Sequence, residues 1–440
     1  MSIGSYSLQN TIVVLLHLLY KLLRVVLSFL TANYFFQPES LKSSMTEKKS
    51  AAPMKNIVIV GGSYAAVNTA HRILKHAKKS GVTQEAFKVT LVSRDSHFYW
   101  NIASPRALIP GQFTDEQVSQ PIAEGFRQYA SQFEFVLASL SRVDVDAKRI
   151  ELVDIDTSKE YKRTLQYDYL ILATGSSTKA SEVPFKSRGS TEATMAALHD
   201  FQNRIGSSRT IAIVGGGATG VETAGEIKFE YGDKKEVILI NSPSELLTGR
   251  PDKVTRTALQ MLQDLHVDVR LNTRVLGTET LEDGRTQLTL SGSGGNNTAT
   301  KDDKLVADLY IPTHGEKPNS SYLPAAFLGK TGHIRVGTYL DVEGADGVYA
   351  LGDVTDLEPA QYLFLEFQSK HIAKNMLLVL GGKPQRPYKP STFTIMGLQI
   401  GRNQSTGHYN NFKFPSWLFA YVRKTLYTEW LPGTVDGSRM

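Results

Sequence analysis

Three glycines, Gly215, Gly217 and Gly220, have the G-x-G-x-x-G spacing that binds the pyrophosphate of a dinucleotide. A short apolar strand pattern comes directly before them, and a helical pattern comes directly after them. The first glycine allows a sharp turn, the second leaves room for the phosphates, and the third lets the helix pack closely. The free N–H groups and dipole of the helix N-terminus favour negative charge. We expect one dinucleotide to bind at Gly215, Gly217, Ala218, Thr219 and Gly220.

A second unit of this kind lies upstream, where an apolar run at 56–60 precedes another small-residue turn. Here Ser63 and Ala66 take the places of the second and third glycines. Both are small, so a tight turn survives, although Ser63 crowds a pyrophosphate more than glycine would. The expected binding residues are Gly61, Gly62, Ser63, Tyr64, Ala65 and Ala66. Two units in one chain predict two cofactors, most economically FAD and NAD(P)H.

Two further strand ends make the pattern specific, A-T-G at 173–175 and G-D at 352–353. With them the chain resembles the two-dinucleotide flavoproteins of the pyridine nucleotide–disulfide reductase superfamily. Within it, the stretch G-G-G-x-x-G-V-E-x-A-x-E-I and the later LGDVTD resemble type II NADH:quinone oxidoreductases. The resemblance extends to their apoptosis-inducing-factor-homologous, ferroptosis-suppressor-like branch. It covers residues 54–382 and leaves out the N-terminus.

The resemblance implies further FAD-binding residues. The A-T-G turn would close the first FAD segment, and the G-D carboxylate would hydrogen-bond ribityl or pyrophosphate oxygens. Arg94 lies where the second strand of the FAD domain ends, and the aromatic stretch after it would run beneath the flavin ring. The implied residues are Arg94, Asn101, Arg106, Ala173, Thr174, Gly175, Gly352 and Asp353.

On the NAD(P)H side, the resemblance implies one catalytic side chain, Glu222, in the G-V-E that begins at the third glycine. A carboxylate there could orient the nicotinamide, so that C4 meets flavin N5, and could pass a proton. The alternative is that it only complements the helix dipole. Asn241 stands where NAD-specific enzymes have an acid, so the choice between NADH and NADPH stays open. Gly315 opens the expected return turn to the FAD domain.

Composition narrows the possible chemistry. The sequence has no cysteine, which excludes disulfides, thiolate metal sites and a redox-active C-x-x-x-x-C pair. We expect no metal site. A net charge of +6 is too diffuse to predict a nucleic-acid partner, and no aromatic–basic module is present.

The two ends of the chain have residue patterns typical of segments that contact a membrane. Residues 1–38 contain no Asp or Glu, and 12–30 are almost all apolar apart from one polar helical stripe. This fits an interfacial anchor, a single span or a mitochondrial targeting segment; the alternative is a helix buried in the domain. Near the C-terminus, aromatic and basic residues at 412–431 suit a helix at a membrane interface or one packed on the flavin domain.

Together these features predict an α/β protein with two Rossmann-like domains, the second inserted in the first. The expected ranges are an anchor at 1–38, a linker at 39–53, FAD domain at 54–183 and 307–385, NAD(P)H domain at 184–306, and a C-terminal segment at 386–440.

We expect an FAD-dependent NAD(P)H:quinone oxidoreductase on a membrane facing a reducing compartment, in the mitochondrion or on a lipid droplet or cytoplasmic membrane surface. Two alternatives are a reductase of a small electron-transfer protein and a slow-turnover redox-sensing, pro-apoptotic flavoprotein. The sequence leaves the oligomeric state open.

Overall fold

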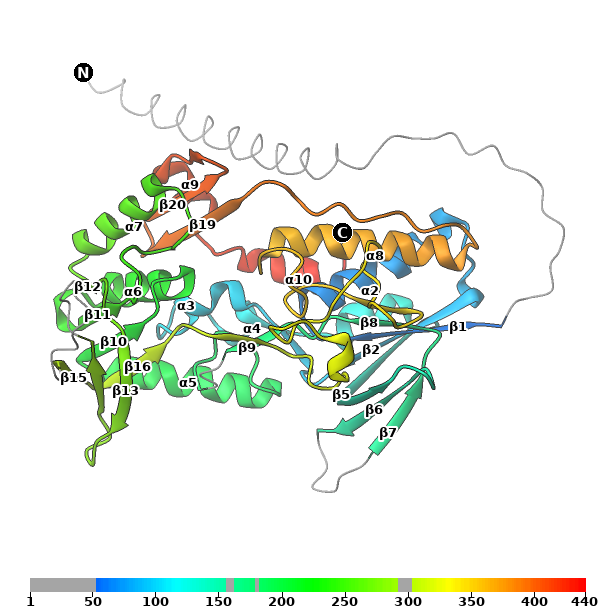
Figure 1. The fold of residues 1–440 in the computed structure, drawn as a ribbon, viewed down its shortest axis with the longest axis horizontal. Helices are drawn as coiled ribbons and strands as arrows, with labels where there is room; N and C mark the ends of the chain where they lie inside the picture. The colour runs from blue at the N-terminus through cyan, green and yellow to red at the C-terminus, as the bar shows by residue number, and fades with distance from the viewer. Residues whose placement is uncertain (1–52, 156–161, 179–181, 292–302) are drawn as a thin grey trace, which may run out of the picture. The chain divides into compact units, whose positions relative to one another are not determined.

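The computed structural model describes residues 53–155, 162–178, 182–291 and 303–440 (Figure 1). The predicted anchor at 1–38 lies outside the described residues, as does the linker up to Ala52. In the described part of the chain, no helix combines the length and apolar character that crossing a bilayer would require.

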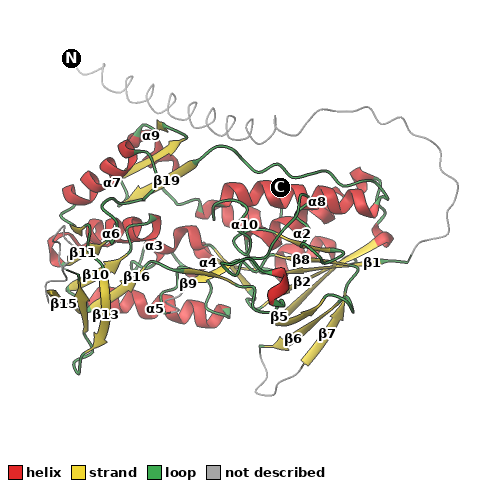
Figure 2. Ribbon diagram, in the orientation of Figure 1, coloured by secondary structure: helices red, strands yellow, loops and turns green. Residues whose placement is uncertain are grey.

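A seven-stranded sheet forms the centre of the first domain (Figure 2). Its strands, in spatial order, are β18 (Val348–Ala350), β8 (Tyr169–Leu172), β1 (Lys55–Val60), β2 (Phe87–Ser93), β5 (Phe133–Asp144), β6 (Arg149–Asp154) and β7 (Lys162–Gln166). The first five run parallel, and β6 and β7 continue antiparallel. Residues 57–60 of β1 are buried on both faces, as an unbroken apolar run in a parallel sheet predicts. Helices α2 (Tyr64–His76) and α8 (Tyr362–Leu380) pack against each other in this domain.

A second, parallel sheet is inserted into the first domain. Its strands, in spatial order, are β12 (Asp268–Arg270), β11 (Glu236–Ile240), β10 (Thr210–Val214) and β16 (Leu309–Pro312). The accompanying elements are α5 (Thr191–Ser207), α6 (Ala218–Tyr231), α7 (Asp252–Asp264), β13 (Val275–Thr280), β14 (Thr286–Leu290) and β15 (Asp303–Ala307). The α/β fold with Rossmann-like sheets is therefore confirmed. Because β16 pairs with β10, the chain returns to the first domain after Pro312, later than the expected boundary at 306.

Two short antiparallel strands, β9 (Ser176–Thr178) and β17 (Glu316–Pro318), lie where the chain leaves the first domain and where it returns. The remaining short elements of the first domain are β3 (His97–Tyr99), α3 (Ser104–Ala107), α4 (Asp115–Val118) and β4 (Ser119–Pro121).

The C-terminal segment folds differently from the expected aromatic helix. It forms a small sheet of β19 (Ile395–Ile400), β20 (Gln404–Tyr409) and β21 (Phe412–Lys413), followed by α9 (Ser416–Val422) and α10 (Leu431–Val435). The sheet packs on α6 and α7 of the second domain. Pro415 is the residue before α9, and the helix ends at Val422, so the helical part of the aromatic stretch is short.

Candidate functional site

A cleft of about 370 Å³ opens at the carboxyl ends of β1, β2, β8 and β18. Residues that follow parallel strands meet at one sheet edge, which is where α/β proteins bind ligands. Of the predicted FAD residues, those lining the cleft are Gly61, Gly62, Ser63, Tyr64, Ala65, Arg94, Asn101, Ala173, Thr174, Gly175, Gly352 and Asp353. Ala66 and Arg106 are not among its lining residues.

The first glycine turn forms one wall of this cleft. Gly61 has φ +140°, and a Cβ there would lie 2.3 Å from the carbonyl oxygen of Ala173. A Cβ on Gly62 would lie 2.1 Å from the Ser93 hydroxyl. Glycine is thus required by the neighbouring strands even before a cofactor binds. The turn aims the N-terminus of α2, with Ser63 as its N-cap residue, at the cleft, and this cradle fits a pyrophosphate.

The A-T-G turn after β8 is locked to the return turn after β17. The Thr174 hydroxyl donates to the Asn319 carbonyl at 2.7 Å, and the Asn319 side-chain amide donates to the Thr174 carbonyl at 2.9 Å. The Thr174 hydroxyl also lies 2.8 Å from the Tyr322 hydroxyl. These contacts join two segments at the cleft: the turn through which the chain leaves the first domain and the turn through which it returns.

Asp353 has a charged partner that the sequence did not reveal. The Lys186 Nζ lies 2.9 Å from Asp353 Oδ2 and 3.2 Å from Glu316 Oε1, and Lys186 also lines the cleft. Burial alone would lower the pKa of Lys186, but the two carboxylates outweigh it and the pKa is raised. No motif surrounds Lys186, so only the fold identifies it.

Arg94 holds a second part of the cleft wall. Its Nη2 donates to the Ser187 carbonyl at 3.3 Å, and its Nε lies 3.8 Å from Asp95. The Ser187 hydroxyl donates in turn to the Asp95 carboxylate, with distances of 2.6 and 2.7 Å to its two oxygens. Burial raises the pKa of Asp95, although Ser187 and Arg94 oppose the shift. The segment that carries Lys186 is therefore pinned to the end of β2.

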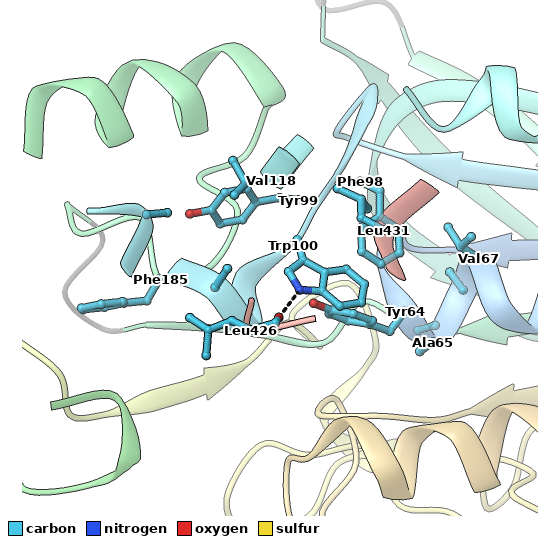
Figure 3. Close-up of a cluster of buried hydrophobic side chains, with 14 of the residues drawn as sticks. Tyr64, Ala65, Val67, Phe98, Tyr99, Trp100, Val118, Phe185, Leu426 and Leu431 are labelled. Atoms are coloured by element: carbon cyan, nitrogen blue, oxygen red, sulfur yellow. Dashed lines mark hydrogen bonds between the residues drawn. The ribbon is translucent and has the colours of Figure 1, made fainter. Parts of the chain in front are cut away.

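Aromatic side chains pack beside the glycine turn (Figure 3). The Tyr64 ring centroid lies 4.8 Å from that of Phe98 and 5.1 Å from that of Trp100. The Trp100 indole N–H donates to the Leu426 carbonyl at 2.9 Å, which brings the C-terminal segment to this wall. Burial raises the pKa of Tyr64, which keeps its hydroxyl neutral.

The structure does not bring Arg106 to the cleft. Its Nε and Nη2 donate to Glu226 Oε1 at 2.9 and 2.7 Å, and its Nη1 donates to the Lys424 carbonyl at 2.6 Å. The side chains of this pair are only 5% and 2% exposed. Arg106 thus joins the first domain to α6 and the C-terminal segment, in place of the flavin contact implied by the resemblance.

The second glycine turn leaves open space where a dinucleotide would approach. A Cβ on Gly220 would lie 1.9 Å from the Gly215 carbonyl oxygen, so this glycine allows α6 to pack against the turn. A Cβ on Gly217 would meet nothing within 4 Å. Gly217 is exposed and precedes Ala218 and Thr219 in the first turn of α6. This second cradle also fits a pyrophosphate.

Asn241 has a different role from the one expected. Its Oδ1 accepts from the Gly216 N–H at 2.9 Å, and its Nδ2 donates to the Glu245 carbonyl at 2.7 Å. It is only 6% exposed. The amide therefore holds the glycine turn to the loop after β11 and is not presented to a ribose. Gly315 has φ +80° in the turn between β16 and β17.

Glu222 lies on α6 and contacts the C-terminal segment. Its Oε1 accepts from the Gln399 N–H and from Arg423 Nη2, both at 3.0 Å. Burial raises the pKa of Glu222, although Arg423 and the Gln399 N–H oppose the shift, and Glu226 adds to it. Both bonds use the same oxygen, so Oε2 keeps its accepting capacity for a ligand.

Comparisons with known proteins agree with this geometry. Residues 44–374 match the family described as pyridine nucleotide-disulphide oxidoreductases. Oxidoreductase ptaL of Pestalotiopsis fici is 52% identical over 388 residues, which cover 88% of this chain and all of that protein. Human ferroptosis suppressor protein 1 is 30% identical, with 81% of this chain and 89% of that protein covered.

A solved structure shares the fold. The sulfide:quinone oxidoreductase of Aquifex aeolicus superposes with a TM-score of 0.69 at 17% identity, covering 87% of this chain and 92% of that one. The match to the family model confirms the resemblance drawn from the motifs, together with the cofactor pair FAD and NAD(P)H.

Proposed function

Because the chain belongs to the pyridine nucleotide-disulphide oxidoreductase family, we propose that it oxidises NAD(P)H through bound FAD and reduces a quinone at a membrane surface. The observation that carries the proposal is the pair of phosphate cradles, one at each glycine turn. The sequence has no cysteine, so a dithiol of this chain cannot relay the electrons. The quinone as acceptor is supported by the fold shared with a sulfide:quinone oxidoreductase.

The protein's own residues bind, orient and exclude water. The N-termini of α2 and α6 would hold the two pyrophosphates, and Asp353 would accept hydrogen bonds from cofactor hydroxyls. FAD, when bound, supplies the two-electron redox chemistry. Tyr64, which lines the cleft and packs against the buried Trp100, would keep water from that chemistry.

Glu222 would orient the nicotinamide ring. Its Oε1 is fixed by Gln399 and Arg423, so the carboxylate has a defined direction before substrate binds. Such preorganisation lowers the entropy lost in placing the reacting atoms. Burial also raises the pKa of Glu222 above the ordinary range of a carboxyl group, which is the direction that a proton donor requires.

An aromatic surface on the C-terminal segment supports a membrane location. Phe412, Trp417 and Tyr421 are 64%, 59% and 46% exposed. Trp417 and Tyr421 are four residues apart on α9 and so share one face. Aromatic side chains of this kind gather at the headgroup level of bilayers. A quinone dissolved in the bilayer would then approach close to Arg423, which directly follows α9, and to Glu222 on α6, which Arg423 contacts.

The catalytic proposal is tested by anaerobic titration of the purified protein. NADH or NADPH should bleach the flavin absorbance, and a soluble quinone should restore it. Bleaching that only a small electron-transfer protein reverses would reject the quinone and favour the alternative reductase. Failure of both nucleotides to bleach the flavin would reject the proposed reaction altogether.

The membrane proposal is tested by co-sedimentation with anionic phospholipid vesicles. Replacing Trp417 and Tyr421 by serine should weaken binding of the full chain. Leu276→Ser is the matched control, because Leu276 is a 58% exposed apolar side chain on β13. If the Trp417/Tyr421 double variant binds vesicles as well as Leu276→Ser does, the aromatic face of α9 does not contact lipid.

A further inference from the structure

Three side chains from distant parts of the sequence form an ionic cluster at the wall of the FAD cleft. Lys186 precedes α5, Glu316 begins the crossover strand β17, and Asp353 follows β18. Lys186 Nζ lies 2.9 Å from Asp353 Oδ2 and 3.2 Å from Glu316 Oε1. The Lys186 and Asp353 side chains are 18% and 24% exposed, whereas Glu316 is 53% exposed. The pair of Lys186 and Asp353 is therefore better shielded from solvent than the pair of Lys186 and Glu316.

Asp353 presents an electrostatic problem for this cleft. The same cleft carries the α2 N-terminus that fits the pyrophosphate of FAD. A carboxylate beside a doubly charged pyrophosphate is unfavourable in a partly desolvated site unless a cation compensates it. Lys186 is placed to do so, since it contacts the carboxylate directly.

The other cations of the cleft are placed differently. Arg94 donates to the Ser187 carbonyl and lies beside Asp95, so its charge is already partnered. Lys317 also lines the cleft and is exposed, and no ion pair of its side chain is seen in the described ranges. Among the cleft cations with a described ion pair, Lys186 alone contacts Asp353.

The backbone around Lys186 is anchored by contacts on both sides. The Tyr99 hydroxyl donates to the Pro184 carbonyl at 2.8 Å, and Phe185 is only 5% exposed. On the other side, the Ser187 hydroxyl donates to Asp95. These contacts fix where the Lys186 side chain starts, so its ammonium is already positioned beside Asp353 before a cofactor binds.

We propose that Lys186 is an FAD-binding residue that acts as the counter-ion of Asp353. Its ammonium cancels the carboxylate charge, so that Asp353 can accept hydrogen bonds from the cofactor while the pyrophosphate lies in the same cleft. The inference rests on FAD binding at this cleft, as the proposed function requires, but not on the identity of the acceptor.

The test is the affinity of FAD for the full-length apoprotein, measured by calorimetric titration. Lys186→Met should weaken FAD binding at least tenfold, and Lys186→Arg should stay within threefold of wild type. Lys55→Met is the matched control. Lys55 pairs with Asp168 at 2.8 Å in the same domain, at the start of β1 and away from the cleft. The Lys55→Met variant should bind FAD with wild-type affinity.

A second background separates the counter-ion role from a general loss of charge. In Asp353→Asn, the carboxylate charge is gone, so adding Lys186→Met should change FAD affinity less than threefold. A full tenfold loss in that background, or wild-type affinity of the single variant, would overturn the proposal. Wild-type apoprotein that binds no FAD would instead overturn the proposed function. Melting of each apoprotein by circular dichroism confirms that the variants compared are folded.

Discussion

Replacing Glu222 by glutamine tests the catalytic assignment and the structure together. Glu222 and Arg423 are each 12% exposed, and both hydrogen bonds of the carboxylate come from the C-terminal segment. Glutamine keeps an oxygen in the same place but loses the charge. From the sequence alone, we would expect almost no change in melting temperature. The buried contacts with Gln399 and Arg423 change that expectation.

The magnitude follows from the two bonds. A hydrogen bond to a charged group contributes about 1.5–3 kcal/mol and a neutral one about 0.5–1.5 kcal/mol, so the bond from the Gln399 N–H should weaken by about 1 kcal/mol. The bond from Arg423 keeps one charged partner but loses the ion pair, which adds a loss of similar size. Burial opposes the charge of Glu222, which returns part of this loss. We therefore expect a destabilisation of about 1–2 kcal/mol. Arg423→Met removes the hydrogen-bond donor as well as the charge, so its cost should approach that of a broken buried pair, about 3–5 kcal/mol.

In Glu222→Gln, turnover should fall by more than the loss of folding stability can explain. A positioned acid or base contributes about 10²–10⁴-fold, so we expect Glu222→Gln to slow turnover at least about tenfold with FAD retained. Rapid mixing with NADH and then with quinone measures each half-reaction separately.

Glu226→Gln is the control for this experiment. Glu226 lies one turn later on α6, is 2% exposed and pairs with Arg106. We expect it to lower the melting temperature while both half-reactions stay near wild type. Wild-type turnover of Glu222→Gln together with slow turnover of Glu226→Gln would refute the assignment.

Four further outcomes are expected. Gly61→Ala should destabilise the first domain and lose FAD, measured by flavin occupancy, because its Cβ would lie 2.3 Å from the Ala173 carbonyl oxygen. Gly217→Val should keep FAD and raise the Michaelis constant for NAD(P)H, since a Cβ there meets open space; a flavin-free product would reverse the cofactor assignment. Deleting residues 1–38 should release the enzyme from membranes in fractionation yet preserve NADH oxidation with a soluble quinone. Burial lowers the pKa of His71 to about 4, so its native state binds fewer protons than the unfolded chain. Stability should therefore fall as pH drops from about 6.5 toward 4, by up to about 3 kcal/mol, and His71→Gln should flatten this slope in melting experiments.

The glycine turns could be predicted from the sequence because they are local. A strand, a turn with positive φ and a helix N-terminus are encoded within a short stretch. Gly61 and Gly220 each leave room for a neighbouring carbonyl oxygen, whereas Gly217 leaves open space on the side where a phosphate would bind. Gly61 and Gly217 occur in the positions that their spacing predicts, and the strands that carry them are central in their sheets. The two-domain α/β fold follows from the same stretches.

The charged contacts could not be predicted because they are not local. Lys186 and Asp353 are 167 residues apart, Arg106 and Glu226 are 120 apart, and Arg423 and Glu222 are 201 apart. Charge alone does not select a partner, since the chain has 49 Lys and Arg and 43 Asp and Glu.

Only the tertiary structure decides which cations and carboxylates meet in places shielded from water, where their interaction is strong. Arg106, which the resemblance placed at the flavin, instead pairs with Glu226 between the domains, and Lys186 lines the cleft. The sequence determines the two phosphate cradles because backbone geometry is local, whereas the charges that surround them depend on how the domains pack.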